Sequence, residues 1–188
     1  MSESIRHLTD EELMAGIEVI CQSPKGEGRL DEIVRRPAVD VRETLAVGEL
    51  HPDVGLVGDT WKSRPSKRTA DHSAHPDMQL TLMNARVATL IAKQRERWQL
   101  AGDQLFVDLD LSVENLPAGT RLAIGENAVV EITTQLHTGC NKFAERFGDA
   151  AWKWVNSQTG KELRLRGVNA RVVSPGSIRQ GETVKVLR

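Results

Sequence analysis

The sequence predicts a mainly β fold, a barrel of short strands with a few peripheral α-helices. From residue 28 onward, short segments rich in Val, Leu and Ile alternate with Gly, Pro and Asn, which is the pattern of strands joined by turns. Long helices do not alternate with strands and no internal repeat occurs. A doubly wound parallel sheet is therefore not expected.

Length and composition are those of one ordinary globular domain. The chain has 188 residues, of which 39% are hydrophobic, and its 25 Lys and Arg nearly balance its 26 Asp and Glu. Without a basic excess, no nucleic-acid partner is expected. No apolar run is long enough to cross a bilayer and the first residues are polar, so we expect a cytoplasmic protein with no membrane partner. Two cysteines, Cys21 and Cys140, are too few for a disulfide framework.

Residues 1–27 are expected to form an accessory helix and a linker, ahead of a single barrel domain over residues 28–188. Thr9 and Glu12 have the spacing of a capping box, and apolar residues follow them at helical intervals. This pattern predicts a helix over residues 9–22.

The middle of the chain combines a turn, a polar loop and a helix. The glycines of residues 55–59 are expected to form a tight turn. Residues 63–77 contain two prolines and almost no large apolar side chain, which predicts an exposed loop or lid. Asn84 then caps a predicted helix that has an apolar side and carries the charged residues 95–97 toward its end.

The segment over residues 105–112 gives the clearest strand signal. Its odd positions are Leu or Val, whereas the even positions are Phe, Asp, Asp and Ser, the period-two pattern of a half-buried strand. Further strands are predicted at residues 120–125, 128–134, 163–173 and 182–187.

Cys140 lies where a segment rich in β-branched residues meets a predicted short helix. Exposed amides at a helix start favour a thiolate, and Lys142 or Arg146 would lower the pKa of the thiol further. The alternative is a small buried hydrophobe at a strand end. His137, three residues earlier, raises the possibility of a Cys-His hydrolase, but no third orienting group is identifiable.

Basic residues gather in the predicted strand over residues 163–173. Arg164, Arg166 and Arg171 flank Gly167 and Asn169. Because alternate side chains of a strand project to one face, these arginines would line an anionic pocket. The alternative is a solvated outer face of the barrel.

Several short motifs occur together in this sequence: Gly-Leu-Val-Gly-Asp at residues 55–59, Glu114-Asn115-Leu116, Cys140 at a strand end, Arg-Gly-x-x-Ala at residues 166–170 and Gly-x-Ile-x-x-Gly at residues 176–181. In this combination, over roughly residues 28–188, the chain resembles the MOSC family, named after the C-terminal domain of molybdenum-cofactor sulfurase. The resemblance implies a β-barrel with a few peripheral helices. It also implies that Cys140 carries a persulfide or binds molybdenum.

The resemblance further implies which residues would hold an anionic molybdenum cofactor. In the family an Arg and a Pro often precede the cysteine, whereas this sequence has His-Thr-Gly at residues 137–139. Arg166 or Arg171 is therefore expected to supply the donor to the cofactor's phosphate. The full set of expected contacts is Asn115, His137, Thr138, Lys142, Arg166, Asn169 and Arg171.

Three functions are compatible with these residues. The first is sulfur handling or molybdenum-cofactor binding, with Cys140 as sulfur carrier or metal ligand. It would require a cysteine desulfurase or a molybdoenzyme as partner, and any pyridoxal phosphate would belong to that partner because the chain has no recognisable Schiff-base lysine motif. The second is a molybdenum-dependent reductase of N-hydroxylated compounds, in which Cys140 stays bound to molybdenum. The third is a non-catalytic barrel that binds another protein.

Overall fold

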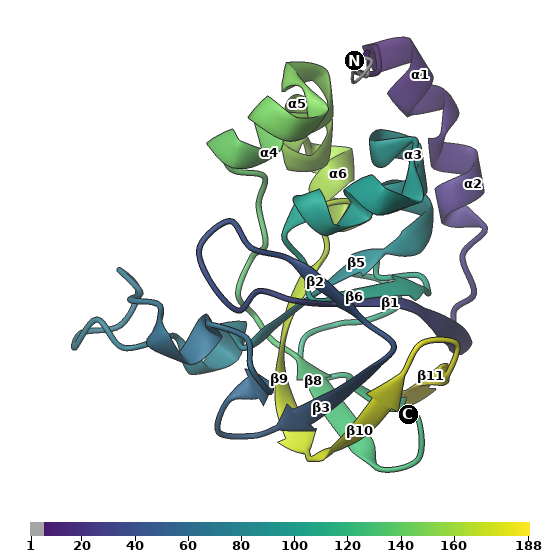
Figure 1. Cartoon of the computed structure of the whole chain (residues 1–188). Coiled ribbons are helices and arrows are strands. Elements are labelled where there is room, and N and C mark those ends of the chain that lie inside the picture. The colour runs from purple at the N-terminus through teal and green to yellow at the C-terminus, as the bar shows by residue number, and fades with distance from the viewer. Residues whose placement is uncertain (1–5) are drawn as a thin grey trace.

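The computed structural model describes residues 6–188, and within them seven strands close into a barrel (Figure 1). The order around the barrel is β1-β11-β7-β8-β9-β5-β6, and β6 pairs with β1 again. The parallel pair β5–β6 contrasts with the antiparallel pairing elsewhere in the ring. The predicted mainly β barrel with peripheral helices is confirmed. The strands are β1 (Glu27–Arg35), β5 (Leu80–Asn84), β6 (Leu105–Asp108), β7 (Arg121–Ile124), β8 (Ala128–Ile132), β9 (Val168–Ser174) and β11 (Thr183–Leu187).

A small three-stranded sheet flanks the barrel. Its central strand β3 (Val47–His51) pairs with β10 (Gly176–Arg179) and β4 (Gly55–Leu56), while β2 (Glu43–Leu45) extends the barrel sheet beyond β1. The turn predicted at residues 55–59 is present, with φ angles of 71° at Gly55 and 83° at Gly58. Such angles favour glycine because a Cβ would clash with the backbone.

The predicted N-terminal helix is present but interrupted. The Thr9–Glu12 capping box begins α1 (Asp10–Ala15), and Gly16 separates it from α2 (Ile17–Cys21). Gly16 packs against the Leu90 side chain, which a Cβ at this position would displace. Residues 1–5 of the expected accessory segment lie outside the described residues.

The helix predicted after Asn84 is also confirmed, but it ends earlier than the sequence predicted. The Asn84 side chain accepts a hydrogen bond from the Arg86 amide and begins α3 (Ala85–Ala92). Lys93 then adopts a φ of 61°, which ends the helix. The charged residues expected in its last turn belong instead to the 3₁₀ helix η3 (Arg95–Ala101).

Helices cover one end of the barrel and form a second core there (Figure 1). The layer contains α3, α4 (Asn141–Phe147), α5 (Asp149–Asn156) and α6 (Gln158–Glu162). In β6, Leu105 and Val107 face the barrel interior, whereas Phe106 packs among the helices, and all three are fully buried. The strand predicted to be half-buried is thus buried on both faces, because the helices cover the face that the sequence assigns to solvent.

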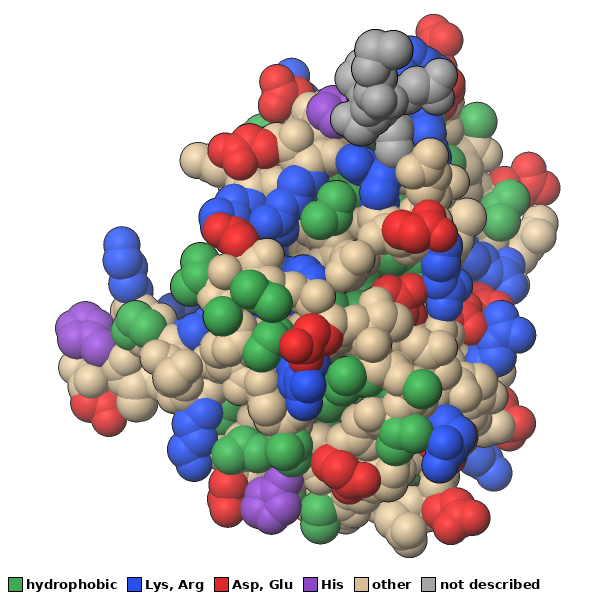
Figure 2. Space-filling model, in the orientation of Figure 1, with side chains coloured by type: hydrophobic (Ala, Val, Ile, Leu, Met, Phe, Trp, Pro, Cys, Tyr) green, Lys and Arg blue, Asp and Glu red, His purple; other side chains and the backbone are tan. Residues whose placement is uncertain are grey.

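Residues 61–78 form an arm that projects from the barrel, with η1 (Trp61–Ser63) and η2 (Pro76–Met78) at its base (Figure 1). Figure 2 shows the arm standing away from the body, with basic side chains on it. The exposed loop predicted at residues 63–77 is confirmed. Among residues 6–188, no helix has the length and apolar character needed to span a membrane.

Candidate functional site

A pocket of about 400 Å³ lies between the arm and the barrel. The arm contributes Trp61 and residues 64–68, and the barrel side contributes Thr81, His137 and Asn169. The pocket is therefore built from segments that are far apart in the sequence and meet only in the fold.

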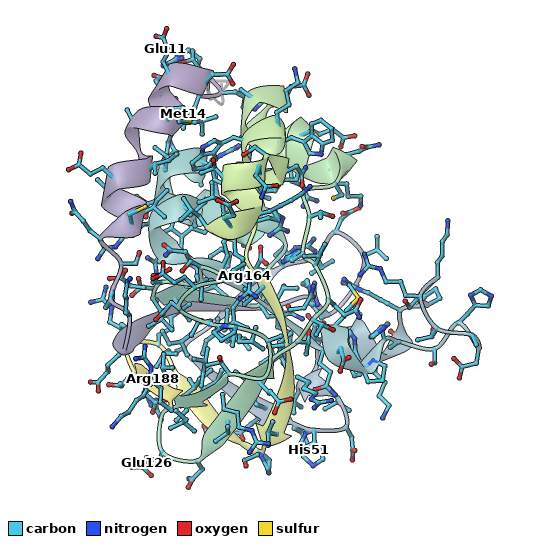
Figure 3. The ribbon with its side chains drawn as sticks, turned by 180° about the vertical axis from the view of Figure 1, so that it is seen from behind. Glu11, Met14, His51, Glu126, Arg164 and Arg188 are labelled. Carbon is cyan, nitrogen blue, oxygen red and sulfur yellow. The ribbon has the colours of Figure 1, made fainter. Side chains whose placement is uncertain are left out.

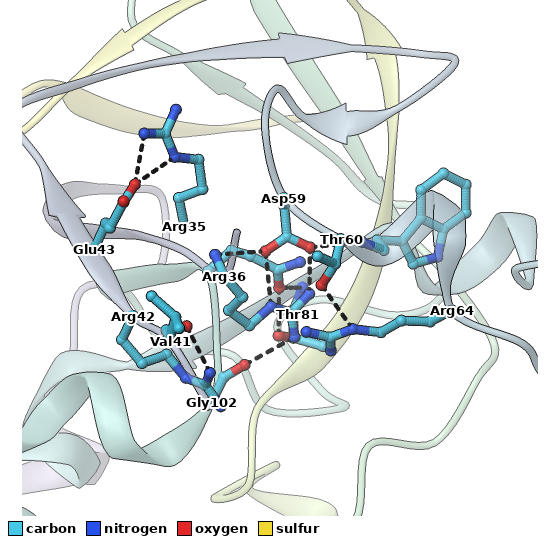
Figure 4. A network of polar contacts seen from close by, with 12 residues as sticks. Arg35, Arg36, Val41, Arg42, Glu43, Asp59, Thr60, Arg64, Thr81 and Gly102 are labelled. Carbon is cyan, nitrogen blue, oxygen red and sulfur yellow. Dashed lines mark hydrogen bonds and ion pairs between the residues drawn. The ribbon is translucent and has the colours of Figure 1, made fainter. Parts of the chain in front are cut away.

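Arg36 lines the pocket, and Asp59 holds its guanidinium in the polar network of Figure 4. The Asp59 carboxylate accepts hydrogen bonds from Nε and Nη2 of Arg36, both 2.8 Å long, and Arg36 Nη1 donates to the Gly102 carbonyl at 3.0 Å. This pair ties the turn at residues 55–59 to the end of β1. Nearby, burial and the positive charges of Arg146 and Arg36 lower the pKa of Arg42, whose Nε is buried without a partner among the described residues.

Arg64 and Arg68 of the arm add positive charge, and neither forms an ion pair with a carboxylate among residues 6–188. Arg64 donates to the Thr60 hydroxyl and Arg68 to the Gln135 side-chain oxygen, each at 2.9 Å, and both acceptors are neutral. Burial, then the neighbouring Arg36, lower the pKa of Arg64. An anion in the pocket would relieve this excess of positive charge, because guanidinium groups bind oxyanions through charge-assisted hydrogen bonds.

A buried ion pair lies behind the pocket. Arg166 Nη1 is 2.6 Å from Asp103 Oδ2, and Arg166 Nη2 donates to the Ala101 carbonyl at 2.8 Å. Burial raises the pKa of Asp103, and the Arg166 guanidinium opposes that rise. His137 Nδ1 lies 3.5 Å from Asp103 Oδ1. Burial lowers the pKa of His137 well below 6.5, and the positive charges of Arg166 and Arg36 act in the same direction.

Asn169 fixes the segment that carries His137. Its Nδ2 donates to the Gln135 carbonyl at 3.1 Å, and its own carbonyl accepts from the Thr133 amide at 3.0 Å. Its Oδ1 is buried and has no partner among residues 6–188. Asn169 therefore orders the wall of the pocket and leaves one acceptor unused.

Cys140 lies at the start of α4, as predicted, and its side chain is exposed. The alternative of a buried structural thiol is wrong. Gly139, just before it, is held at both backbone atoms: its N donates to Asn156 Oδ1 at 2.9 Å, and its O accepts from Trp152 Nε1 at 2.9 Å. Cys140 is three positions after His137, so their Cα atoms are at most about 11 Å apart.

The basic residues expected to act on Cys140 have a carboxylate partner. Lys142 Nζ is 2.9 Å and Arg146 Nη2 is 3.5 Å from Asp40 Oδ1. Arg146 also donates to the Leu100 carbonyl at 2.7 Å, which fixes its guanidinium against η3. Asp40 therefore shares the charge of both cations.

The structure brings some predicted contact residues together and places others elsewhere. His137 and Asn169 line the basic pocket. Thr138 lines a neighbouring pocket of about 360 Å³, which shares His137 with the basic pocket and is mostly apolar. Asn115 lies in another region, where its Nδ2 donates to the carbonyls of Lys25 and Asp110 at 3.0 and 2.7 Å.

The expectation that the arginines share one face of a strand is wrong. β9 begins at Val168, because Arg164, with a φ of 49°, and Gly167, with a φ of 102°, form a turn before it. Arg164 lies between the helical layer and the barrel (Figure 3) and donates to the Leu116 carbonyl at 2.5 Å. Arg171 is half exposed on the outer face of the barrel and pairs with Glu131 and Asp77.

Arg36, Arg64 and Arg68, which line the pocket, and Asp103, which lies behind it, were not predicted from the sequence. A signal was available for the arm, because residues 63–68 contain three basic side chains within an exposed loop. No local signal marks Asp103, because its partner Arg166 is 63 positions away in the sequence.

A closed barrel of seven strands capped by helices defines the chain as a small β-barrel protein. A family model of the MOSC domain matches residues 69–185, more than half of the chain. The chain belongs to the MOSC domain family. A search of curated proteins gives no significant match.

Solved structures share the fold at low sequence identity. The YuaD protein from Bacillus subtilis is 14% identical, with a TM-score of 0.60 over 85% of this chain and 95% of that one. YiiM from Escherichia coli is 21% identical, with a TM-score of 0.54 over 85% and 70% of the two chains. YiiM from Geobacillus stearothermophilus is 16% identical, with a TM-score of 0.56 over 86% and 75%. At these identities the similarity supports the fold alone.

Proposed function

We propose that this MOSC protein binds an anionic cofactor of the molybdenum-cofactor type in the basic pocket and presents the thiol of Cys140 to it. The observation that carries the proposal is the positive charge of Arg64 and Arg68, whose hydrogen-bond partners among residues 6–188 are neutral, near the segment that ends in an exposed cysteine. A phosphate is the kind of ligand that such guanidinium groups bind.

The residues present fit such a cofactor. Arg64, Lys67 and Arg68 on the arm would hold its phosphate, and Asn169 and His137 line the opposite wall. A single soft thiolate suits a molybdenum ion whose other ligands come from the cofactor itself. When bound, that group would supply the metal for redox chemistry, while the chain would fix its position and supply the thiolate.

Exposure of Cys140 favours a role as sulfur carrier. A carrier thiol must reach a donor protein, and the Cys140 side chain is accessible at the start of α4. The thiolate of Cys140 would attack the terminal sulfur of a persulfide on a cysteine desulfurase, forming a persulfide on Cys140 and releasing the donor's thiolate. Any pyridoxal phosphate would stay with that partner, and a molybdoenzyme would receive the product.

A second candidate is a molybdenum-dependent reductase of N-hydroxylated compounds. The mostly apolar pocket that shares His137 with the basic pocket supports this candidate, because it offers about 360 Å³ for an uncharged substrate beside the cofactor. In that case Cys140 would remain a permanent ligand of molybdenum. A barrel that only binds another protein is the third possibility, and Cys140 would then have no chemical role.

Native mass spectrometry with metal analysis tests the proposal on protein from a cofactor-producing host. The variant is Cys140→Ala, and the matched control is Cys21→Ala, because Cys21 is the other exposed free cysteine in the described part of the chain. Cofactor retained stoichiometrically by the wild type and the control but lost from Cys140→Ala supports the reductase. Sulfur added to Cys140 without retained molybdenum supports the carrier. If neither appears after exposure to free cofactor and a cysteine desulfurase, the proposal is wrong.

A further inference from the structure

Two buried polar atoms face each other behind the basic pocket. Asp103 Oδ1 and His137 Nδ1 are 3.5 Å apart, and neither has a hydrogen-bond partner among residues 6–188. The other oxygen of Asp103 is held by Arg166 at 2.6 Å, which fixes the carboxylate. A hydrogen on Nδ1 that is directed at Asp103 would satisfy both atoms, because a carboxylate paired with arginine accepts and does not donate.

The charges around His137 keep its ring neutral. Burial lowers the pKa of His137 well below 6.5, and Arg166 and Arg36 disfavour the imidazolium further. The charged groups that face the ring come from three segments: Arg36 after β1, Asp103 before β6 and Arg166 before β9. A neutral ring with its hydrogen on Nδ1 has a lone pair on Nε2, so it accepts a hydrogen bond at that atom.

A second acceptor lines the same pocket. Asn169 is 1% exposed, its Nδ2 is used by the Gln135 carbonyl, and its buried Oδ1 has no partner in the described chain. The cationic side chains of the arm line the same pocket. The pocket therefore combines donors for an anion with acceptors that require a hydrogen from the ligand.

We propose that His137, positioned by Asp103, forms with Asn169 an acceptor pair that selects ligands in which an anionic group lies beside an O–H or N–H hydrogen. The inference deepens the proposed anion-binding pocket and rests on it. Hydrogen phosphate and protonated phosphate monoesters belong to this ligand class, whereas oxyanions without a hydrogen do not. An acceptor buried without a partner is costly, so a ligand that cannot donate loses affinity.

Inorganic phosphate and sulfate are matched probes for this pair. Near pH 7 both are small tetrahedral oxyanions, but only phosphate carries an O–H. By calorimetry the wild type should bind phosphate at least about tenfold more tightly than sulfate. His137→Phe should remove the preference while leaving sulfate affinity nearly unchanged. His137→Gln retains an acceptor oxygen and should keep part of the preference for phosphate. Arg68→Gln should weaken the binding of both anions.

The outcomes separate the selectivity from the pocket itself. Binding of both anions with equal affinity by the wild type, or an unchanged preference in a folded His137→Phe variant, overturns the acceptor pair but leaves the anion pocket. Failure of the wild type to bind either anion overturns the anion pocket and the selectivity together.

Nitrogen-15 NMR of the histidine side chains tests the orientation of His137 without any ligand. The expected signature at pH 7 is a neutral ring with its hydrogen on Nδ1, and Asp103→Asn should change it, with thermal unfolding used to confirm that the variant is folded. Exposed His72 provides a reference signal from the arm. A hydrogen on Nε2, or a charged ring at pH 7, overturns the role of Asp103.

Discussion

The indole Nε1 of Trp152 donates a hydrogen bond of 2.9 Å to the carbonyl oxygen of Gly139, one residue before the exposed thiol of Cys140. Asn156, one turn further along α5, binds the same residue at both N and O, at 2.9 and 3.2 Å. Helix α5 thus fixes the backbone that presents the cysteine. A thiol that must meet either a donor protein or a cofactor benefits from such a fixed support.

Asn156→Ala should destabilise the protein by about 1–3 kcal/mol, because the Gly139 amide loses its acceptor and its carbonyl loses one of two donors. Urea denaturation measures the loss. Hydrogen exchange at the Gly139 amide should also become faster. Lys153→Ala, an exposed position on the same helix, is the control and should alter neither quantity. Unchanged exchange at Gly139 in the Asn156 variant would contradict the support assigned to α5.

Arg166→Leu should destabilise the protein by about 3–5 kcal/mol, because it leaves the Asp103 carboxylate buried without a cation. The double variant Asp103→Asn with Arg166→Leu should recover part of that loss, since no uncompensated charge remains. Arg121→Leu removes only a surface pair with Glu131 and should move the denaturation midpoint little. If the double variant lost as much free energy of unfolding as the two single variants together, Asp103 and Arg166 would not be coupled.

The stability of the fold should decrease as the pH falls below about 6.5. Burial, with Arg166 and Arg36, lowers the pKa of His137 in the folded state, whereas the unfolded chain retains the ordinary value. Below pH 6.5 the unfolded chain therefore binds a proton that the folded protein does not. The free energy of unfolding then falls by up to about 1.4 kcal/mol for each pH unit. Urea denaturation at pH 7.5, 6.5 and 5.5 should show a shallower dependence in His137→Phe. Equal slopes in the two proteins would contradict the lowered pKa.

Gly167→Ala should be far more destabilising than Gly181→Ala, although both glycines have positive φ angles of 102° and 88°. A Cβ at Gly167 would collide with the Leu82 carbonyl oxygen, whereas nothing lies within 4 Å of one at Gly181. We expect about 1 kcal/mol for Gly181→Ala from backbone strain alone and at least about 2 kcal/mol more for Gly167→Ala. Thermal unfolding compares them, at about 2–4 °C per kcal/mol for a chain of this size. Equal thermal unfolding midpoints for the two variants would contradict the clash, because they would show that the loop before β9 shifts to accommodate the added Cβ.

The local elements were predictable because their signals are local. The capping box at Thr9, the cap at Asn84 and the helix start after Cys140 each depend on residues within a few positions of one another. The strand boundaries near residue 163 were not predictable, because a period-two pattern of arginines and leucines continues through a turn that begins with the left-handed backbone of Arg164.

By itself the sequence determined the mainly β architecture, the exposed arm and the position of Cys140 at the start of a helix, since turn residues, polarity and caps act over short distances. Only the tertiary structure decided which charges meet. Arg166 pairs with the buried Asp103 and Arg171 with Glu131 on the outer face. The cations that line the pocket are Arg36 and the basic residues of the arm. The physical reason is that a side chain's charge acts through space, so its partner depends on how strands and loops close around it.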